Sequence, residues 1–138
     1  IVIKGVEKLG LMDFIAYNIL GLSNSLIILM LLVIWISAIV SAFVDNIPFV
    51  MAMMSVITVI SKALPVNITP LYWALSLGGC LGGNATLVGA SANIVVAGIA
   101  EKHGYHISFK SFMRYGLPVM LITVGASSIY LVLRYSLL

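Results

Sequence analysis

Charged side chains are scarce in this sequence: Asp, Glu, Lys and Arg make up 8% of its 138 residues, against about 25% in soluble domains. Apolar residues account for 62%, and the mean hydropathy is +1.21. Uncharged runs cover 14–44, 46–61, 63–100 and 115–133. A membrane-spanning helix needs about 20 mostly apolar residues. The composition therefore excludes a soluble domain and predicts an integral membrane protein surrounded by the lipid bilayer.

Patterns that carry catalytic chemistry are also missing. Cys80 is the only cysteine, so no internal disulfide can form. His103 and His106 lie three residues apart without the further ligands that a transition-metal site needs. The sequence holds no nucleophile and base at a catalytic spacing and no nucleotide-binding loop, and its net charge is only +3. We therefore expect no enzyme, no nucleic-acid partner, no transition-metal site and no organic cofactor.

The most informative segment present is 78–93, GGCLGGNATLVGASAN, inside the longest uncharged run. Its glycines and small polar residues are typical of a loop, yet the apolar sequences on both sides place it at membrane depth. Irregular backbone is tolerated there only inside protein or beside a polar cavity, because lipid satisfies no backbone hydrogen bond. Transporters bind substrates and coupling ions at such interrupted helices. We predict a helix over about 71–81, a break, and a second half-helix over about 90–101.

Two explanations of this segment are open. Gly78 with Gly82, and Gly79 with Gly83, have the spacing of membrane helices that pack closely. Close packing does not explain the hydrogen-bonding side chains of the break, which are Asn84, Thr86, Ser91 and Asn93. An unwound segment exposes carbonyls that attract a cation and amides that attract an anion. This second explanation predicts an ion-binding break.

Asp45 is the only acidic residue between Asp13 and Glu101, and long apolar runs flank it. It begins the sequence Asp-Asn-Ile-Pro, in which the proline disfavours helix at the residue before it. We predict a hairpin over 26–61 that dips into the membrane and returns, with a helix to residue 44, a tip at 45–48 and a shorter arm over 49–60. One full span followed by a partial one is the alternative. A capped turn at the water surface would explain Asp45, whereas a carboxylate at membrane depth would be a cation ligand or a protonatable group.

The rest of the chain completes a single membrane domain. Residues 1–24 read as a surface helix or the tail of an earlier span, 102–115 as an interfacial segment, and 117–134 as a final span. Gly104 is expected to end the second half-helix. The chain starts at Ile1 without an initiator methionine and is short for a carrier, so we expect the C-terminal part of a larger transporter. Two smaller expectations concern single residues. Ser37 and Ser41 should bond back to their own helix. Trp35, Tyr72 and Trp73 should pack against other helices or anchor the protein at the interface.

Two motifs at a fixed interval resemble a known group of transporters. SAFVDNIPFVMAM at 41–53 and LGGCLGGNATLVGASANIVVAGIAEKHGYHISFKSF at 77–112 are similar to the ion transporter superfamily of arsenite permeases, sodium/proton antiporters, citrate carriers and sodium–dicarboxylate symporters. Within it the P protein (pink-eyed dilution) group is the best match. The resemblance implies an all-α integral membrane fold with two inverted repeats, each with a re-entrant helical hairpin and a discontinuous helix. This chain then corresponds to the hairpin, the broken helix and the final spanning helix of the C-terminal repeat.

The resemblance also implies that the bound species lies between the hairpin tip and the helix break. The dicarboxylate branch has Ser-Asn-Thr at its tip, so the Asp-Asn-Ile-Pro tip argues against sodium–dicarboxylate use and is closer to a proton- or cation-coupled member. The coupling ion would be a proton, or a sodium ion near Asp45, Asn46 and Asn84. Binding roles fall on Asp45, Asn46 and Pro48 at the tip and on Gly83, Asn84, Thr86, Ser91 and Asn93 at the break.

We therefore expect a secondary active transporter that moves a small ion, preferably an anion, by alternating access coupled to a proton or sodium gradient. The alternatives are a channel-like anion conductance, a sodium/proton antiporter, and a structural subunit in which the glycines only pack helices. The expected partners are an N-terminal repeat and a second copy in a homodimer. The expected location is an acidic, melanosome-like organelle membrane for an animal P protein and the plasma membrane for a prokaryotic relative.

Overall fold

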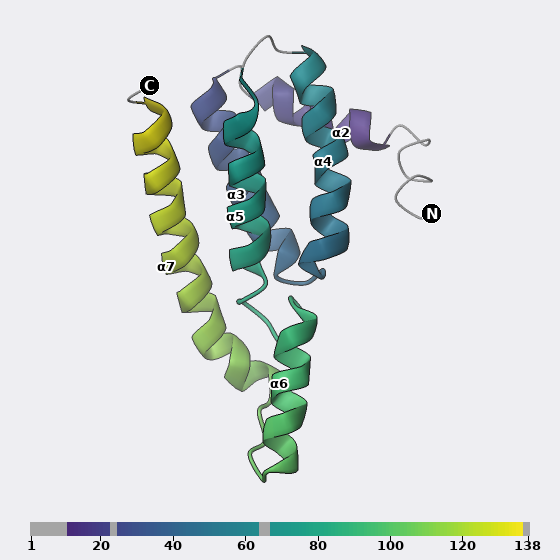
Figure 1. The fold of residues 1–138 in the computed structure, drawn as a ribbon, viewed down its shortest axis with the longest axis vertical. Coiled ribbons are helices and arrows are strands. Elements are labelled where there is room, and N and C mark those ends of the chain that lie inside the picture. Colours follow the sequence, from purple (N-terminus) through teal and green to yellow (C-terminus); the bar gives the residue numbers. More distant parts are fainter. Residues whose placement is uncertain (1–10, 23–24, 64–66, 137–138) are drawn as a thin grey trace.

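The computed structural model describes residues 11–22, 25–63 and 67–136, and every regular element in these ranges is an α-helix. In Figure 1, α3, α4, α5 and α7 run alongside one another, α2 crosses one end of this bundle, and α6 projects from the other end. Two of the helices, α4 and α7, are long and apolar enough to cross a membrane. The helices are α2 (Leu11–Leu22), α3 (Leu26–Ser41), α4 (Asn46–Ala63), α5 (Thr69–Gly82), α6 (Ser91–Lys102) and α7 (Phe109–Ser136).

The lengths of α3 and α4 differ from the expected ones. The prediction of a short second arm is wrong: α4 has 18 residues and α3 has 16, or about 27 Å and 24 Å at 1.5 Å per residue. Pro48 lies in the first turn of α4, where a missing N–H costs nothing, so the helix begins before the proline. At the other end α4 includes Lys62, whose charge is favourable in the last turn of a helix.

The glycines of α5 allow its closest contact, which is with α3. A Cβ atom on Gly78 would overlap the carbonyl oxygen of Ile34, and one on Gly82 would overlap that of Ala38. Because a backbone carbonyl cannot rotate away, no larger residue fits at either position without moving the helices apart. The packing explanation therefore holds for Gly78 and Gly82. Gly79 faces α4 instead, where an added Cβ would lie 2.8 Å from Cγ2 of Val50.

The predicted interruption is present, and its observed bounds agree closely with the predicted ones. α5 ends at Gly82 and α6 begins at Ser91, with irregular backbone at 83–90. Gly104, with φ of 85°, follows α6 as predicted. Its N–H donates to the carbonyl of Glu101 and the N–H of Tyr105 donates to that of Ala100, both at 3.0 Å. These two bonds are the pattern of a glycine-terminated helix.

The expected interfacial segment and final span form one helix. α7 starts at Phe109 and continues to Ser136 through Gly116 and Pro118, so the predicted boundary near residue 116 is wrong. Residues 105–108 are the only non-helical part of the segment that follows Gly104. A proline inside a helix removes one backbone hydrogen bond but need not end the helix when the flanking turns stay paired.

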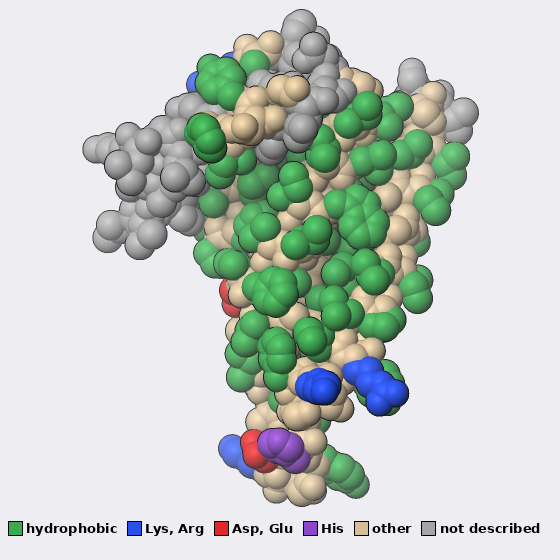
Figure 2. Space-filling view, turned by 180° about the vertical axis from the view of Figure 1, so that it is seen from behind, with side chains coloured by type: hydrophobic (Ala, Val, Ile, Leu, Met, Phe, Trp, Pro, Cys, Tyr) green, Lys and Arg blue, Asp and Glu red, His purple; other side chains and the backbone are tan. Residues whose placement is uncertain are grey.

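Apolar side chains cover most of the described part of the face shown in Figure 2, between the two ends of the bundle. Large ones are more than half exposed on several helices, including Ile122 at 71% and Val96 at 62%. Soluble proteins rarely expose apolar patches of this extent. The distribution agrees with helices that face lipid, and the chain is therefore a membrane protein.

Candidate functional site

The hairpin tip, which the structure places at residues 42–45 between α3 and α4, is in direct contact with the helix break and with the end of α5. Ser41, the last residue of α3, donates a hydrogen bond of 2.6 Å from its hydroxyl to the carbonyl of Gly79. The hydroxyl of Thr86 donates to the carbonyl of Ala42. Both hydroxyls are buried. Ala42 and Gly79 lie where helices end or approach closely, so these side chains pair carbonyls that lipid would leave unsatisfied.

The break is closed by hydrogen bonds among its own residues. The hydroxyl of Thr86 accepts from the N–H of Gly89 at 3.1 Å. The side-chain amide of Asn93, in the first turn of α6, donates to the carbonyls of Gly83 at 2.9 Å and Thr86 at 3.0 Å. A Cβ on Gly89 would lie 2.8 Å from the Gly83 oxygen and 3.0 Å from the Ala42 oxygen. The segment 83–90 is thus a compact loop seated on the tip.

Other predicted residues keep unused polar groups. The side chains of Asn46 and Asn84 and the hydroxyl of Ser91 make no hydrogen bond within the part of the chain that the structure describes. Asp45 precedes α4, and its Oδ1 accepts a long bond of 3.4 Å from the N–H of Ile47, as a residue at a helix start does. Asp45 and Asn46 are half-buried, and Asn84 and Ser91 are exposed.

α7 forms a wall beside the break. A Cβ on Gly116 would overlap the carbonyl oxygen of Asn84 and lie 2.8 Å from that of Ala85, so only glycine permits this approach. A cavity of about 470 Å³ lies beside this contact, along the start of α7. Its lining includes Asn84, Ser111, Tyr115 and Gly116. The free amide of Asn84 therefore lies at a space that a small ion and several waters would fit.

The chemical groups at this junction suit small ions rather than bond-breaking chemistry. α6 begins after Ala90 without a side-chain cap, and free amides at a helix start attract anions. Asp45 is the only carboxylate of the tip and break, and carboxylate, amide and carbonyl oxygens are the ligands of hard cations. No group of three or more His, Cys, Asp or Glu side chains gathers within the described ranges.

The eight predicted residues fall into three groups. Gly83, Thr86 and Asn93 are used to hold the break together, whereas Asp45, Asn46, Asn84 and Ser91 present open polar groups and Pro48 shapes the first turn of α4. The roles of four further residues at this junction were not predicted, namely Ser41, Ala42, Gly89 and Gly116. The expectation that Ser37 and Ser41 bond back to their own helix is wrong, since Ser41 bonds to α5 and the buried hydroxyl of Ser37 has no partner among the described residues. The close approach of α5 to α3 brings a carbonyl of α5 within reach of Ser41.

Comparison with known proteins gives consistent matches. A family described as citrate transporter matches residues 1–138. The chain is 48% identical to the P protein of Mus musculus over 106 residues, which are 75% of this chain and 13% of that protein. It is 41% identical to the P protein of Homo sapiens over 132 residues, 94% of this chain and 16% of that protein. An uncharacterized transporter of Mycobacterium tuberculosis is 44% identical over 106 residues, 75% of this chain and 25% of that protein.

These relatives are much longer than the matched region. The chain spans between 13% and 25% of the length of the three relatives named above. No solved structure matches it significantly.

Proposed function

Because this chain belongs to the citrate transporter family, we propose that its full protein is a secondary active transporter for a small ion, preferably an anion. Transport would proceed by alternating access and would be coupled to a proton or sodium gradient. The bound ion would lie between the tip at 45–48 and the break at 83–90.

One observation carries this proposal: the backbone is interrupted between α5 and α6 at the place where the turn between α3 and α4 contacts it, through the hydrogen bond from Thr86 to Ala42. The interruption leaves the free amide of Asn84 beside a cavity, and it leaves the start of α6 without a side-chain cap. Maintaining irregular backbone in a membrane protein requires dedicated hydrogen bonds, and Thr86 and Asn93 supply them. A segment that only packed helices would not need an open cavity next to it.

The proposed roles follow from which groups are free. Asn84 and Ser91 would contact the anion together with the first amides of α6. Asp45 and Asn46 would hold the coupling cation or, in the case of Asp45, carry the coupling proton. No further cofactor enters this proposal. The hairpin formed by α3 and α4 would be re-entrant, since α3 is shorter than a full span needs.

The remaining proposals concern the whole protein. α6 has no buried residue and exposes the apolar side chains of Ile94, Val95, Val96 and Ile99. We propose that the N-terminal repeat of the parent protein covers part of this helix and completes the site, and that the parent forms a homodimer. The membrane would be that of an acidic, melanosome-like organelle in an animal and the plasma membrane in a prokaryote.

The test is tracer flux into proteoliposomes that contain the full-length parent protein, with a panel of small anions and sodium and with imposed pH or sodium gradients. We expect saturable, gradient-driven uptake. Asn84→Ala should raise the half-saturating concentration about 10- to 100-fold, because a hydrogen bond to a charged group contributes about 1.5–3 kcal/mol. Asp45→Asn should abolish the response to the driving gradient, because the amide can neither titrate nor neutralise a cation.

Two matched substitutions serve as controls. Glu101→Gln removes an exposed carboxylate at the far end of α6, and Asn18→Ala removes an exposed amide on α2. Both should transport like the parent. Uptake unchanged in Asp45→Asn and Asn84→Ala would refute the proposed site. Non-saturating flux that ignores the second ion would identify a channel, and strict exchange of sodium for protons would identify an antiporter.

A further inference from the structure

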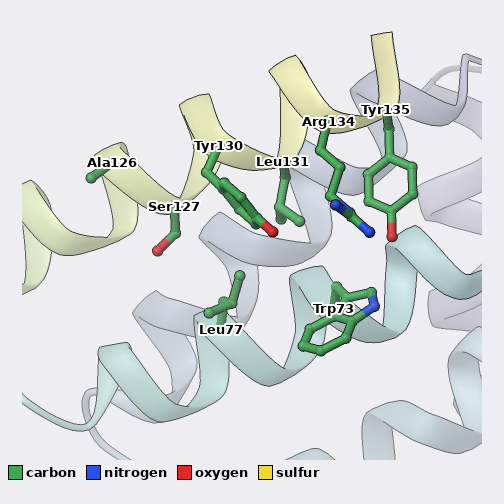
Figure 3. Close-up of a pocket in the computed structure, with 8 residues that line it drawn as sticks. All are labelled: Trp73, Leu77, Ala126, Ser127, Tyr130, Leu131, Arg134 and Tyr135. Carbon is green, nitrogen blue, oxygen red and sulfur yellow. The ribbon is translucent and has the colours of Figure 1, made fainter. Parts of the chain in front are cut away.

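A second cavity lies between α5 and α7, away from the tip and the break. Its volume is about 560 Å³. Figure 3 shows side chains of both helices facing it, with aromatic rings and a guanidinium gathered toward one end. Nothing in the proposed transport site uses this groove. It is lined by Trp73, Leu77, Ala126, Ser127, Tyr130, Leu131, Arg134 and Tyr135.

The groove is polar at one end and apolar along its length. Arg134 lies between the rings of Tyr130 and Tyr135 and points toward α5, where Trp73 lies opposite (Figure 3). Leu77 and Ala126 continue the groove away from this end. From Ala126 to Arg134 the helix advances about 12 Å. An amphipathic molecule with a compact head and a hydrocarbon chain matches this arrangement.

The polar end of the groove lies where a membrane surface is expected. Trp73 is near the start of α5 and Arg134 is in the last turn of α7, and these two helix ends lie at the same end of the bundle (Figure 1). Trp and Tyr gather at the level of lipid headgroups, where their rings are in contact with both hydrocarbon and water. A lipid in the groove would therefore place its headgroup beside Arg134 and its acyl chain beside Leu77.

Arg134 has no acidic partner within the described residues. The single ion pair in those ranges joins His106 and Glu101, at the end of α6 that lies farthest from Arg134 (Figure 1). The planar guanidinium of arginine donates paired hydrogen bonds to phosphate more effectively than an ammonium does. The hydroxyls of Tyr130 and Tyr135 are additional donors on either side of it. The charge and the donors together favour a headgroup that carries a phosphate and a net negative charge.

We propose that this groove binds one anionic phospholipid, with its phosphate on Arg134 and one acyl chain along Leu77 and Ala126. Basic pockets between membrane helices bind lipid headgroups in this manner. Another segment of the full-length protein is the alternative occupant of the groove, and the experiment below distinguishes it from a lipid.

The experiment uses the full-length parent protein, purified in detergent and titrated with phosphatidylglycerol or phosphatidylcholine. Bound lipids are counted by native mass spectrometry. We expect one tightly retained phosphatidylglycerol and weaker retention of phosphatidylcholine. Arg134→Gln should weaken phosphatidylglycerol binding about 10- to 100-fold. Ala126→Trp, which fills the apolar part but keeps the charge, should also reduce retention.

Lys62→Gln is the matched control, because Lys62 is in the last turn of α4 at the same end of the bundle but outside the groove. It should bind phosphatidylglycerol like the parent. Equal retention of phosphatidylglycerol by the parent and by Arg134→Gln would overturn the proposal. A parent protein that retains no phosphatidylglycerol would also overturn it, because another segment of the protein would then fill the groove. Displacement of the lipid by millimolar inorganic phosphate would also overturn it, because the site would then be one for free anions. Gel filtration of each variant checks that it is folded.

Discussion

Replacing Gly82 with valine is expected to prevent accumulation of folded protein. The first added atom would overlap the carbonyl oxygen of Ala38 and lie 2.6 Å from its Cα and 2.8 Å from its carbonyl carbon. All three are backbone atoms of α3, so no side-chain rotation relieves the overlap. Separating α3 from α5 would open the most extensive helix contact in the described chain. The change therefore belongs to the small class of substitutions that cost more than about 4–5 kcal/mol.

The measurement is the amount of monodisperse full-length protein that elutes from a gel-filtration column after expression as a fluorescent fusion. Gly125→Val is the matched control, because it makes the same change inside α7, where an added Cβ meets nothing within 4 Å. Gly79→Ala should be intermediate, since its added atom meets the side chain of Val50, which can adjust. A Gly82→Val protein that elutes like the parent would show that α3 and α5 do not approach as closely as described.

The α5–α6 interruption was predictable because its residues contradict their surroundings. Glycine, asparagine, threonine and serine at 78–93 lie between strongly apolar sequences, and local composition alone indicates a broken helix. Gly104 was predictable for a similar reason, since a glycine after a helix is typical of a left-handed residue. Each of these features depends on residues close together in the chain.

The features that were missed depend on residues far apart in the chain. Ser41 bonds to Gly79 and Thr86 bonds to Ala42, and a hydroxyl gives no sign in the sequence of whether it pairs within its helix or across to another. The same limit applies to Gly116, whose role appears only when α7 lies against Asn84. The predicted length of α4 is too short because Pro48 and Lys62 resemble helix boundaries, although both are tolerated in the end turns of helices.

The division of the site into holding and contacting residues has a testable consequence at Thr86. Its hydroxyl donates to Ala42 and accepts from Gly89, so both of its hydrogen bonds go to backbone groups. Thr86→Val keeps the shape of the side chain but leaves the buried carbonyl of Ala42 without its donor, whereas the N–H of Gly89 retains a longer bond of 3.3 Å to the carbonyl of residue 86. An unpaired buried group costs about 1–3 kcal/mol. The tip and the break would then no longer be fixed to each other.

We expect Thr86→Val to lower the transport rate of the full-length protein at least about tenfold, and Thr86→Ser to retain it because serine supplies the same hydroxyl. Hydrogen exchange measured by mass spectrometry should show faster exchange at Gly89 and around 42–45 in Thr86→Val, with α7 unchanged. Asn84→Ala should show the opposite combination, with weakened transport and parent-like exchange, since its amide holds no part of the fold.

If Thr86→Val transports normally while exchange at Gly89 rises, the attachment of the break to the tip is not required for transport. If instead Thr86→Val and Asn84→Ala behave alike in both measurements, the two residues share one role and the proposed division is wrong.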